Sequence, residues 1–244
     1  MKRAFPILAV VTALLLAYAL YQALVVAPTE QTMGDVQRIF YYHVPSAWTA
    51  FLLFMINLVA SVVYLVRRNP KADALAVVSA EVGVVFCTVV LVTGPIWARP
   101  VWGIWWTWDV RLTTTLVLWL IYVSYLVLRR FSDSAQTPVL AAALAIFGAL
   151  DVPLVYFSIW FFRTQHPQPV IGGGGSIDPR MMHVLLFNWL AFSCFAFLVC
   201  WLRYRLERLQ REVEEAQALE SLLGAGGPSI QSAKAKVPLS RGAK

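Results

Sequence analysis

The sequence predicts an all-α integral membrane protein with six transmembrane helices, cytoplasmic termini and a tryptophan-rich periplasmic segment. The composition supports this class, because 59% of the 244 residues are hydrophobic and only 14% are charged. Soluble domains carry about 25% charged residues. This chain therefore has too little polar sequence to cover a water-soluble fold, and lipid is the solvent that suits it.

Continuous apolar runs locate the expected helices. A bilayer core about 30 Å thick is crossed by roughly 20 apolar residues in a helix, whereas barrel strands alternate over about ten residues. We expect the first run, directly after Lys2 and Arg3, to be a retained helix, because it lacks the short apolar core and cleavage site of a signal peptide. The predicted spans are 5–27, 48–66, 75–97, 112–128, 139–162 and 181–202.

The positive charges are divided unequally between the two sides of such a bundle. When the six spans alternate in direction, 15 of the 20 Lys and Arg residues fall on the side that holds both termini. Positive residues accumulate on the cytoplasmic side of membrane proteins. Both termini are therefore expected in the cytoplasm. We expect function on the opposite, outer side, because the longer and chemically richer loops 28–47, 98–111 and 163–180 lie there.

The chain is expected to have three parts. Residues 1–203 form the membrane domain. Residues 204–223 continue as a cytoplasmic amphipathic helix, since apolar residues recur there at three- and four-residue steps. This helix is interpreted as a basic rim on the lipid surface or as a docking helix for a partner. Residues 224–244 are rich in Gly, Pro, Ser, Ala and Lys, a composition typical of disorder.

The three cysteines, Cys87, Cys194 and Cys200, lie inside predicted helices. Their spacing forms neither a C-x-x-C pair nor a C-x-x-C-H haem-attachment motif. Dithiol chemistry and a covalently attached haem are therefore excluded. The sequence also lacks a nucleotide-binding motif, so any ATP hydrolysis must come from partner proteins.

One outward loop concentrates the aromatic side chains. Residues 97–108 contain five of the ten tryptophans. If residues 102–108 are helical, Trp102, Trp105 and Trp106 share one face and offer a platform for a flat apolar ligand. An interfacial aromatic belt at headgroup level is the alternative. The residues alone leave both interpretations open.

The histidines and arginines of the outer loops are candidate ligand-binding groups. A single histidine at a helix end is usually an interfacial hydrogen-bonding group, whereas two on the same membrane face can supply both axial ligands of a planar iron macrocycle. Arginines there either extend to lipid headgroups or make paired hydrogen bonds to carboxylates of a ligand. These residues are His43, His166, His183, Arg38, Arg99, Arg111, Arg163 and Arg180.

Several segments together resemble one family. Residues 92–113, VTGPIWARPVWGIWWTWDVRLT, are similar to the WWD motif of haem-handling membrane proteins. Residues 38–45 and 152–166 are similar to the two histidine segments of the CcmC family, and the matches run in order through residues 36–180. One departure is Pro167, where the family commonly has glutamine after the histidine.

The resemblance implies that haem b is bound as cargo, with His43 and His166 as axial ligands. It also implies that the protein catalyses no covalent bond formation. His183 matches no histidine of the family pattern. The implied haem platform consists of Trp102, Gly103, Trp105, Trp106, Trp108, Asp109 and Arg111. The candidate contacts of the haem propionates are Arg38, Arg99 and Arg163.

The resemblance also implies partners and a location. In the family, a periplasmic haem chaperone (CcmE) captures the haem for c-type cytochrome biogenesis. An ATP-binding transporter complex in the bacterial inner membrane (CcmA and CcmB, with small CcmD) then assists release of the loaded chaperone.

Two other classes of function stay open. A b-type electron-transfer subunit normally places histidine pairs within its spans. A small-molecule transporter is expected to have polar or broken helices near mid-membrane.

Two acidic residues, Glu81 and Asp151, lie within predicted spans, where carboxylates are costly. We expect them to pair or to line a cavity rather than to perform chemistry.

Overall fold

A computed structural model of the protein describes residues 4–132, 134–162, 164–169 and 176–226. Across these residues the secondary structure is helical, without a β-strand. Six helices are long and apolar enough to cross a membrane. The prediction of an all-α, multi-pass membrane protein is confirmed.

The helices follow the order of the predicted spans. A π-helical segment, η1 (Gln22–Val26), extends the first helix, and a 3-10 segment, η2 (Asp35–Ile39), leads into the second. The α-helices are α1 (Ala4–Tyr21), α2 (Phe40–Arg67), α3 (Pro70–Trp102), α4 (Val110–Phe131), α5 (Thr137–Phe161) and α6 (Pro179–Gly226).

The chain divides into two compact units, Met1–Tyr204 and Arg205–Lys244, so that α6 contributes to both. Two parts of the expected organisation lie outside the described residues: most of the predicted tail, namely residues 227–244, and Arg163.

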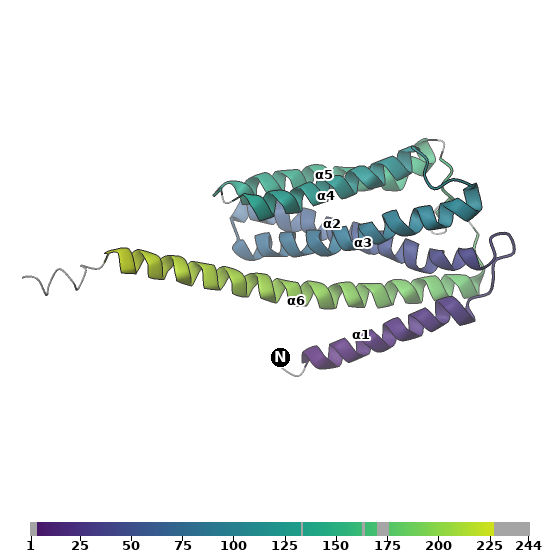
Figure 1. The fold of residues 1–244 in the computed structure, drawn as a ribbon, viewed down its shortest axis with the longest axis horizontal. Coiled ribbons are helices and arrows are strands. Elements are labelled where there is room, and N and C mark those ends of the chain that lie inside the picture. The colour runs from purple at the N-terminus through teal and green to yellow at the C-terminus, as the bar shows by residue number, and fades with distance from the viewer. Residues whose placement is uncertain (1–3, 133, 163, 170–175, 227–244) are drawn as a thin grey trace, which may run out of the picture. The chain divides into compact units, whose positions relative to one another are not determined.

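Helices α2 to α5 run side by side in the first unit (Figure 1). Phe54 of α2 stacks on Tyr122 of α4, with ring centroids 3.8 Å apart and planes within 10°. Glycines permit this close packing, since a Cβ on Gly83 would come 2.7 Å from the Phe54 ring and one on Gly148 would come 2.8 Å from Ile121. Small residues at interfaces let transmembrane helices approach closely.

The first part of α6, residues 179–204, packs against α1 and α2. The side-chain amide of Asn188 donates to the carbonyl of Ala19 in α1 at 3.4 Å. Trp189 meets Trp48 of α2 edge to face, with ring centroids 5.2 Å apart. These contacts join the outer ends of α2 and α6, where the candidate site lies.

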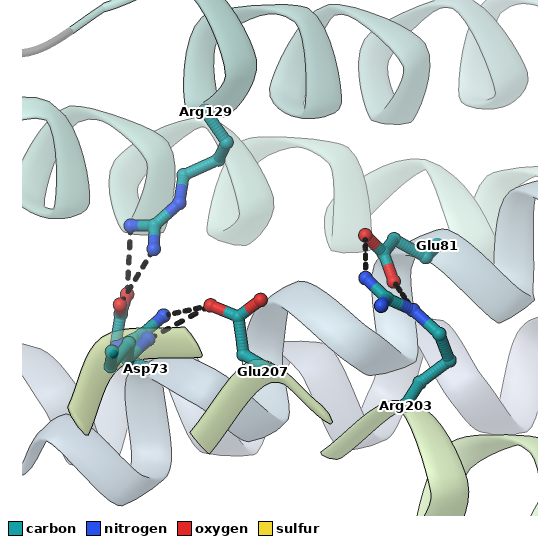
Figure 2. Close-up of polar contacts among 6 residues, drawn as sticks. Asp73, Glu81, Arg129, Arg203 and Glu207 are labelled. Atoms are coloured by element: carbon teal, nitrogen blue, oxygen red, sulfur yellow. Dashed lines mark hydrogen bonds and ion pairs between the residues drawn. The ribbon is translucent and has the colours of Figure 1, made fainter. Parts of the chain in front are cut away.

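Carboxylates at the opposite end of the bundle are paired with arginines (Figure 2). Arg129 of α4 donates two hydrogen bonds to Asp73 of α3, at 2.7 and 2.9 Å. Arg203 of α6 likewise binds Glu81 of α3 at 2.8 and 2.9 Å. Glu81 therefore has the kind of pairing that we expected of a carboxylate within a membrane span.

Two helix boundaries differ from those of the apolar runs. Helix α2 begins at Phe40 instead of near residue 48, so that His43 is helical. Tyr41, with an exposed fraction of 0%, packs inside the bundle, although its hydroxyl and the nearby histidine interrupt the apolar pattern. Helix α3 continues beyond residue 97 and ends at Trp102, where Gly103 adopts a left-handed conformation (φ 78°) that glycine tolerates well.

Candidate functional site

A cavity of about 990 Å³ lies among the outer ends of the helices of the first unit. Its wall consists of residues 28–33, the start of α2, the end of α3, the start of α4, the loop after α5 and the start of α6. This volume is at the upper end of the range of about 300–1,000 Å³ for small-molecule sites. The lining is mainly apolar and aromatic, and its titratable groups include His43, His166, Arg111, Arg180, Glu30 and Asp178.

Two of the lining histidines lie next to each other. His43 comes from the first turn of α2, and His166 comes from the loop that follows α5. Their ring centroids are 6.4 Å apart, and the ring planes differ by 33°. A metal ion with one nitrogen of each ring at about 2.0–2.1 Å would hold the centroids about 6 Å apart. The spacing therefore suits two imidazoles on opposite sides of one metal ion.

The hydrogen bonds of His43 leave its Nε2 atom available. The Nδ1 atom lies 2.9 Å from the hydroxyl oxygen of Thr93. Thr93 donates its own hydroxyl hydrogen to the carbonyl of Val89 at 2.7 Å, so Nδ1 is the donor in the contact with Thr93. A neutral imidazole with its hydrogen on Nδ1 has its lone pair on Nε2. Outer hydrogen bonds of this kind orient metal-binding histidines.

His166 has the same tautomer for a different reason. Its Nδ1 atom lies 2.9 Å from the carbonyl oxygen of Pro167, and a carbonyl can only accept, so Nδ1 again donates. Burial, reinforced by the nearby Arg111 cation, lowers the pKa of His166 to about 3. The ring is therefore neutral at physiological pH, and its Nε2 lone pair is available to a ligand.

The tryptophans of residues 102–108 fall into two groups. Trp102 and Trp106 line the cavity, whereas Trp105 and Trp108 have exposed fractions of 59% and 75%. Residues 102–108 are not one helix, because α3 ends at Trp102 and Gly103 adopts a left-handed conformation, so the condition for a shared helical face is not met. The predicted set is thus divided between the cavity wall and the outer surface.

Two of the candidate arginines line the cavity, and two others lie outside its described wall. Arg111 lines the cavity and donates to the carbonyl of Tyr156 at 3.4 Å. Arg180, a candidate ligand-binding arginine that was not among the implied propionate contacts, also lines the cavity. Its guanidinium pairs with Asp178 at 2.9 Å, which holds the pKa of that carboxyl below its usual range.

Arg38 and Arg99 serve as local caps and are not among the described residues of the cavity wall. Arg38 donates to the carbonyls of Ala23 and Ala27 at the end of η1, and pairs with Asp35 at 3.0 Å. Arg99 is exposed and donates to the carbonyl of Gly103 at the end of α3. Of the three predicted propionate contacts, Arg38 and Arg99 thus lie outside the described cavity wall, and Arg163 lies outside the described residues.

Asp109 also lies outside the described cavity wall. It caps the first turn of α4, accepting a hydrogen bond from the backbone N–H of Leu112 at 2.9 Å. It further accepts hydrogen bonds from Thr164 and Gln165, in the loop that carries His166. These contacts link the start of α4 to the loop after α5, and the place of Asp109 in a haem platform stays a prediction.

Sequence reasoning missed several residues of the wall. Trp48 and Trp189 lie at the outer ends of α2 and α6, and the segment 28–33 closes one side. The outward position of these tryptophans was a usable signal, but their convergence depends on packing between helices far apart in sequence.

Asp151 has a buried Oδ2 atom without a hydrogen-bond partner among the described residues, and it is not part of the described wall.

Fold and site together define a multi-pass membrane protein with a histidine- and tryptophan-lined ligand cavity at one end of its helical bundle. The chain belongs to the CcmC family, described as heme exporter protein C, whose profile matches residues 1–219.

Individual relatives agree with this assignment. Heme exporter protein C of Bradyrhizobium diazoefficiens is 36% identical over 222 residues, which cover 90% of this chain and 84% of the relative. Heme exporter protein C of Escherichia coli is 32% identical over 201 residues, 82% of each chain. A putative cytochrome c biosynthesis ccmC-like mitochondrial protein of Marchantia polymorpha is 34% identical over 185 residues, 75% of this chain and 78% of the relative.

Proposed function

We propose that the protein binds haem b as cargo in the outer cavity and delivers it to a periplasmic haem chaperone for c-type cytochrome biogenesis. The observation that carries this proposal is the pair His43 and His166, whose ring centroids are 6.4 Å apart in the cavity wall. Haem iron takes axial ligands from opposite faces of the macrocycle. Relatives named heme exporter protein C support haem as the metal-containing ligand.

The remaining wall suits the other parts of a haem. Trp102 and Trp106 supply aromatic contact to the macrocycle, since aromatic faces stack on flat π-systems. Arg111 and Arg180 supply cations within the same cavity, and arginine binds carboxylates through paired, charge-assisted hydrogen bonds. We therefore assign the haem propionates to these two arginines rather than to Arg38 and Arg99.

The charge distribution supports a periplasmic cavity in the bacterial inner membrane. Helices α2 and α4 end in Arg67, Arg129 and Arg130, at the end of the bundle away from the cavity. Positive residues mark the cytoplasmic side, so the cavity faces the periplasm and both termini are cytoplasmic.

The chain acts as a haem-handling component rather than as an enzyme. Its own residues hold the iron through two imidazoles and orient the macrocycle. The haem chaperone (CcmE) supplies the covalent capture, and the transporter subunits (CcmA, CcmB and CcmD) supply ATP hydrolysis.

Transfer to the chaperone can be tested with purified proteins. We expect the protein to be purified with stoichiometric haem, visible in its absorption spectrum. Incubation with the haem-free chaperone should then move the haem to the chaperone, where it survives denaturing electrophoresis as a covalent stain. A chain truncated after Gly224 keeps every residue of the cavity wall and is the matched control, which should load and transfer haem like the full chain.

The outcome separates the three classes of function. Haem that cycles between oxidation states but never leaves the protein would contradict delivery and favour an electron-transfer subunit. A protein that never acquires haem would contradict the proposal entirely and favour a transporter of another small molecule.

A further inference from the structure

Asp109, the aspartate that ends the tryptophan segment, joins two separate parts of the chain. It is half-buried, and its two carboxylate oxygens have different partners. The Oδ1 atom accepts from the backbone N–H of Leu112 at 2.9 Å and so caps α4. The Oδ2 atom accepts from the hydroxyl of Thr164 at 2.7 Å and from the backbone N–H of Gln165 at 3.3 Å.

The contacts of Asp109 continue to His166. The hydroxyl oxygen of Thr164, which donates to Asp109, also accepts from the backbone N–H of His166 at 3.1 Å. Helix α5 ends at Phe161, so no helical hydrogen-bond ladder fixes the backbone of this loop. The chain of hydrogen bonds from the first turn of α4 therefore defines where His166 stands.

We propose that Asp109 is a positioning residue that holds the imidazole of His166 at the iron through Thr164 and Gln165. This inference rests on the proposed function, because it presumes that His166 is a haem ligand. It gives the aspartate a role at a distance from the haem: the aspartate sets the position of one ligand relative to α4. Hydrogen bonds beyond the ligands typically change metal affinity about 10–100-fold.

The donors around Asp109 require a carboxylate. The N–H groups of Leu112 and Gln165 and the hydroxyl of Thr164 all point at its two oxygens. Asparagine has one oxygen and one NH₂ group. In one orientation its NH₂ meets the N–H of Leu112, and in the other it meets the N–H of Gln165. Either orientation places two donors against each other, so asparagine breaks the cap or the link to the loop.

Four variants separate positioning from simple capping. Asp109→Ser keeps an N-cap residue but is too short to reach Thr164, and Thr164→Val removes the hydroxyl without touching the cap. Both variants, like Asp109→Asn, should convert part of the ferric haem from six-coordinate low-spin to five-coordinate high-spin. They should also release haem about 10–100-fold faster. Added imidazole should restore the low-spin spectrum, and Thr164→Ser should recover the spectrum of the unaltered protein.

The alternatives give different results. If Asp109→Asn loses haem while the remaining haem stays fully low-spin, Asp109 contacts the cargo directly and the inference is wrong. If Asp109→Ser and Thr164→Val both behave like the unaltered protein, Asp109 is only a helix cap and the inference is also wrong. If His166→Gly leaves the spectrum of the unaltered protein unchanged, the proposed function itself fails, and the inference falls with it.

Discussion

Replacement of His43 or His166 with glycine is expected to reduce bound haem about tenfold or more, since loss of even an outer-shell partner costs about 10–100-fold in metal affinity. Each substitution removes one of the two imidazoles that stand 6.4 Å apart in the cavity wall. The haem that remains should be five-coordinate and high-spin. Added imidazole should partly restore both the amount of haem and the low-spin spectrum, because glycine leaves room for a free ligand at the vacated position.

His183→Ala is the control for this prediction. His183 is exposed on α6 and is not among the described residues of the cavity wall, so this variant should retain haem like the unaltered protein. Haem content per folded protein is the measurement. If His183 is required and His166 is dispensable, α6 supplies the ligand and the assignment of the pair is incorrect.

The double substitution Trp102→Ala with Trp106→Ala is expected to lower haem retention and transfer sharply while the protein stays in the membrane. Both side chains line the cavity. An aromatic pair contributes about 0.5–1.5 kcal/mol beyond burial of area. The loss of two such contacts amounts to about 1–3 kcal/mol, a factor of roughly ten to a hundred in affinity.

Trp105→Ala is the matched control, since it removes a neighbouring tryptophan with an exposed fraction of 59% from outside the described cavity wall. It should leave haem content unchanged. Dissociation of haem into an excess of a haem-scavenging protein would give the relative affinities. Equal retention in the double variant and the control would return the segment to an ordinary aromatic belt at the membrane interface.

The number of helices could be predicted from the apolar runs of the sequence, because a membrane span requires a long apolar run wherever it occurs in a fold. Helix ends could not be predicted equally well. Tyr41 and His43 interrupt the apolar pattern, yet they lie in α2 because Tyr41 is buried within the bundle. The boundary of α2 therefore depends on tertiary packing that the local pattern does not contain.

The site was predictable to the extent that its residues lie on the outer side. The sequence indicated His43, His166, Arg111 and the tryptophan segment as candidates, and the structure brings both histidines, Arg111, Trp102 and Trp106 to one cavity. That these side chains bind haem remains a proposal.

Directions of individual side chains were not predictable. Helix α3 ends at Trp102 and Gly103 adopts a left-handed conformation, so the tryptophans of residues 102–108 do not share one helical face. Arg38 was a candidate because of its charge and side, but the carbonyls of Ala23 and Ala27 engage its guanidinium. The link between Asp109 and Thr164 joins residues 55 positions apart, and no local pattern indicates it.

In the proposed complex, one haem is held between His43 and His166. Electron paramagnetic resonance of the ferric, haem-loaded protein with ¹⁵N-labelled histidine tests it most directly, because hyperfine coupling counts the histidine nitrogens on the iron. We predict a low-spin signal coupled to two histidine nitrogens, with one coupling lost in His43→Gly and the other in His166→Gly. A high-spin signal in the unaltered protein, or two couplings that survive both substitutions, would contradict the account.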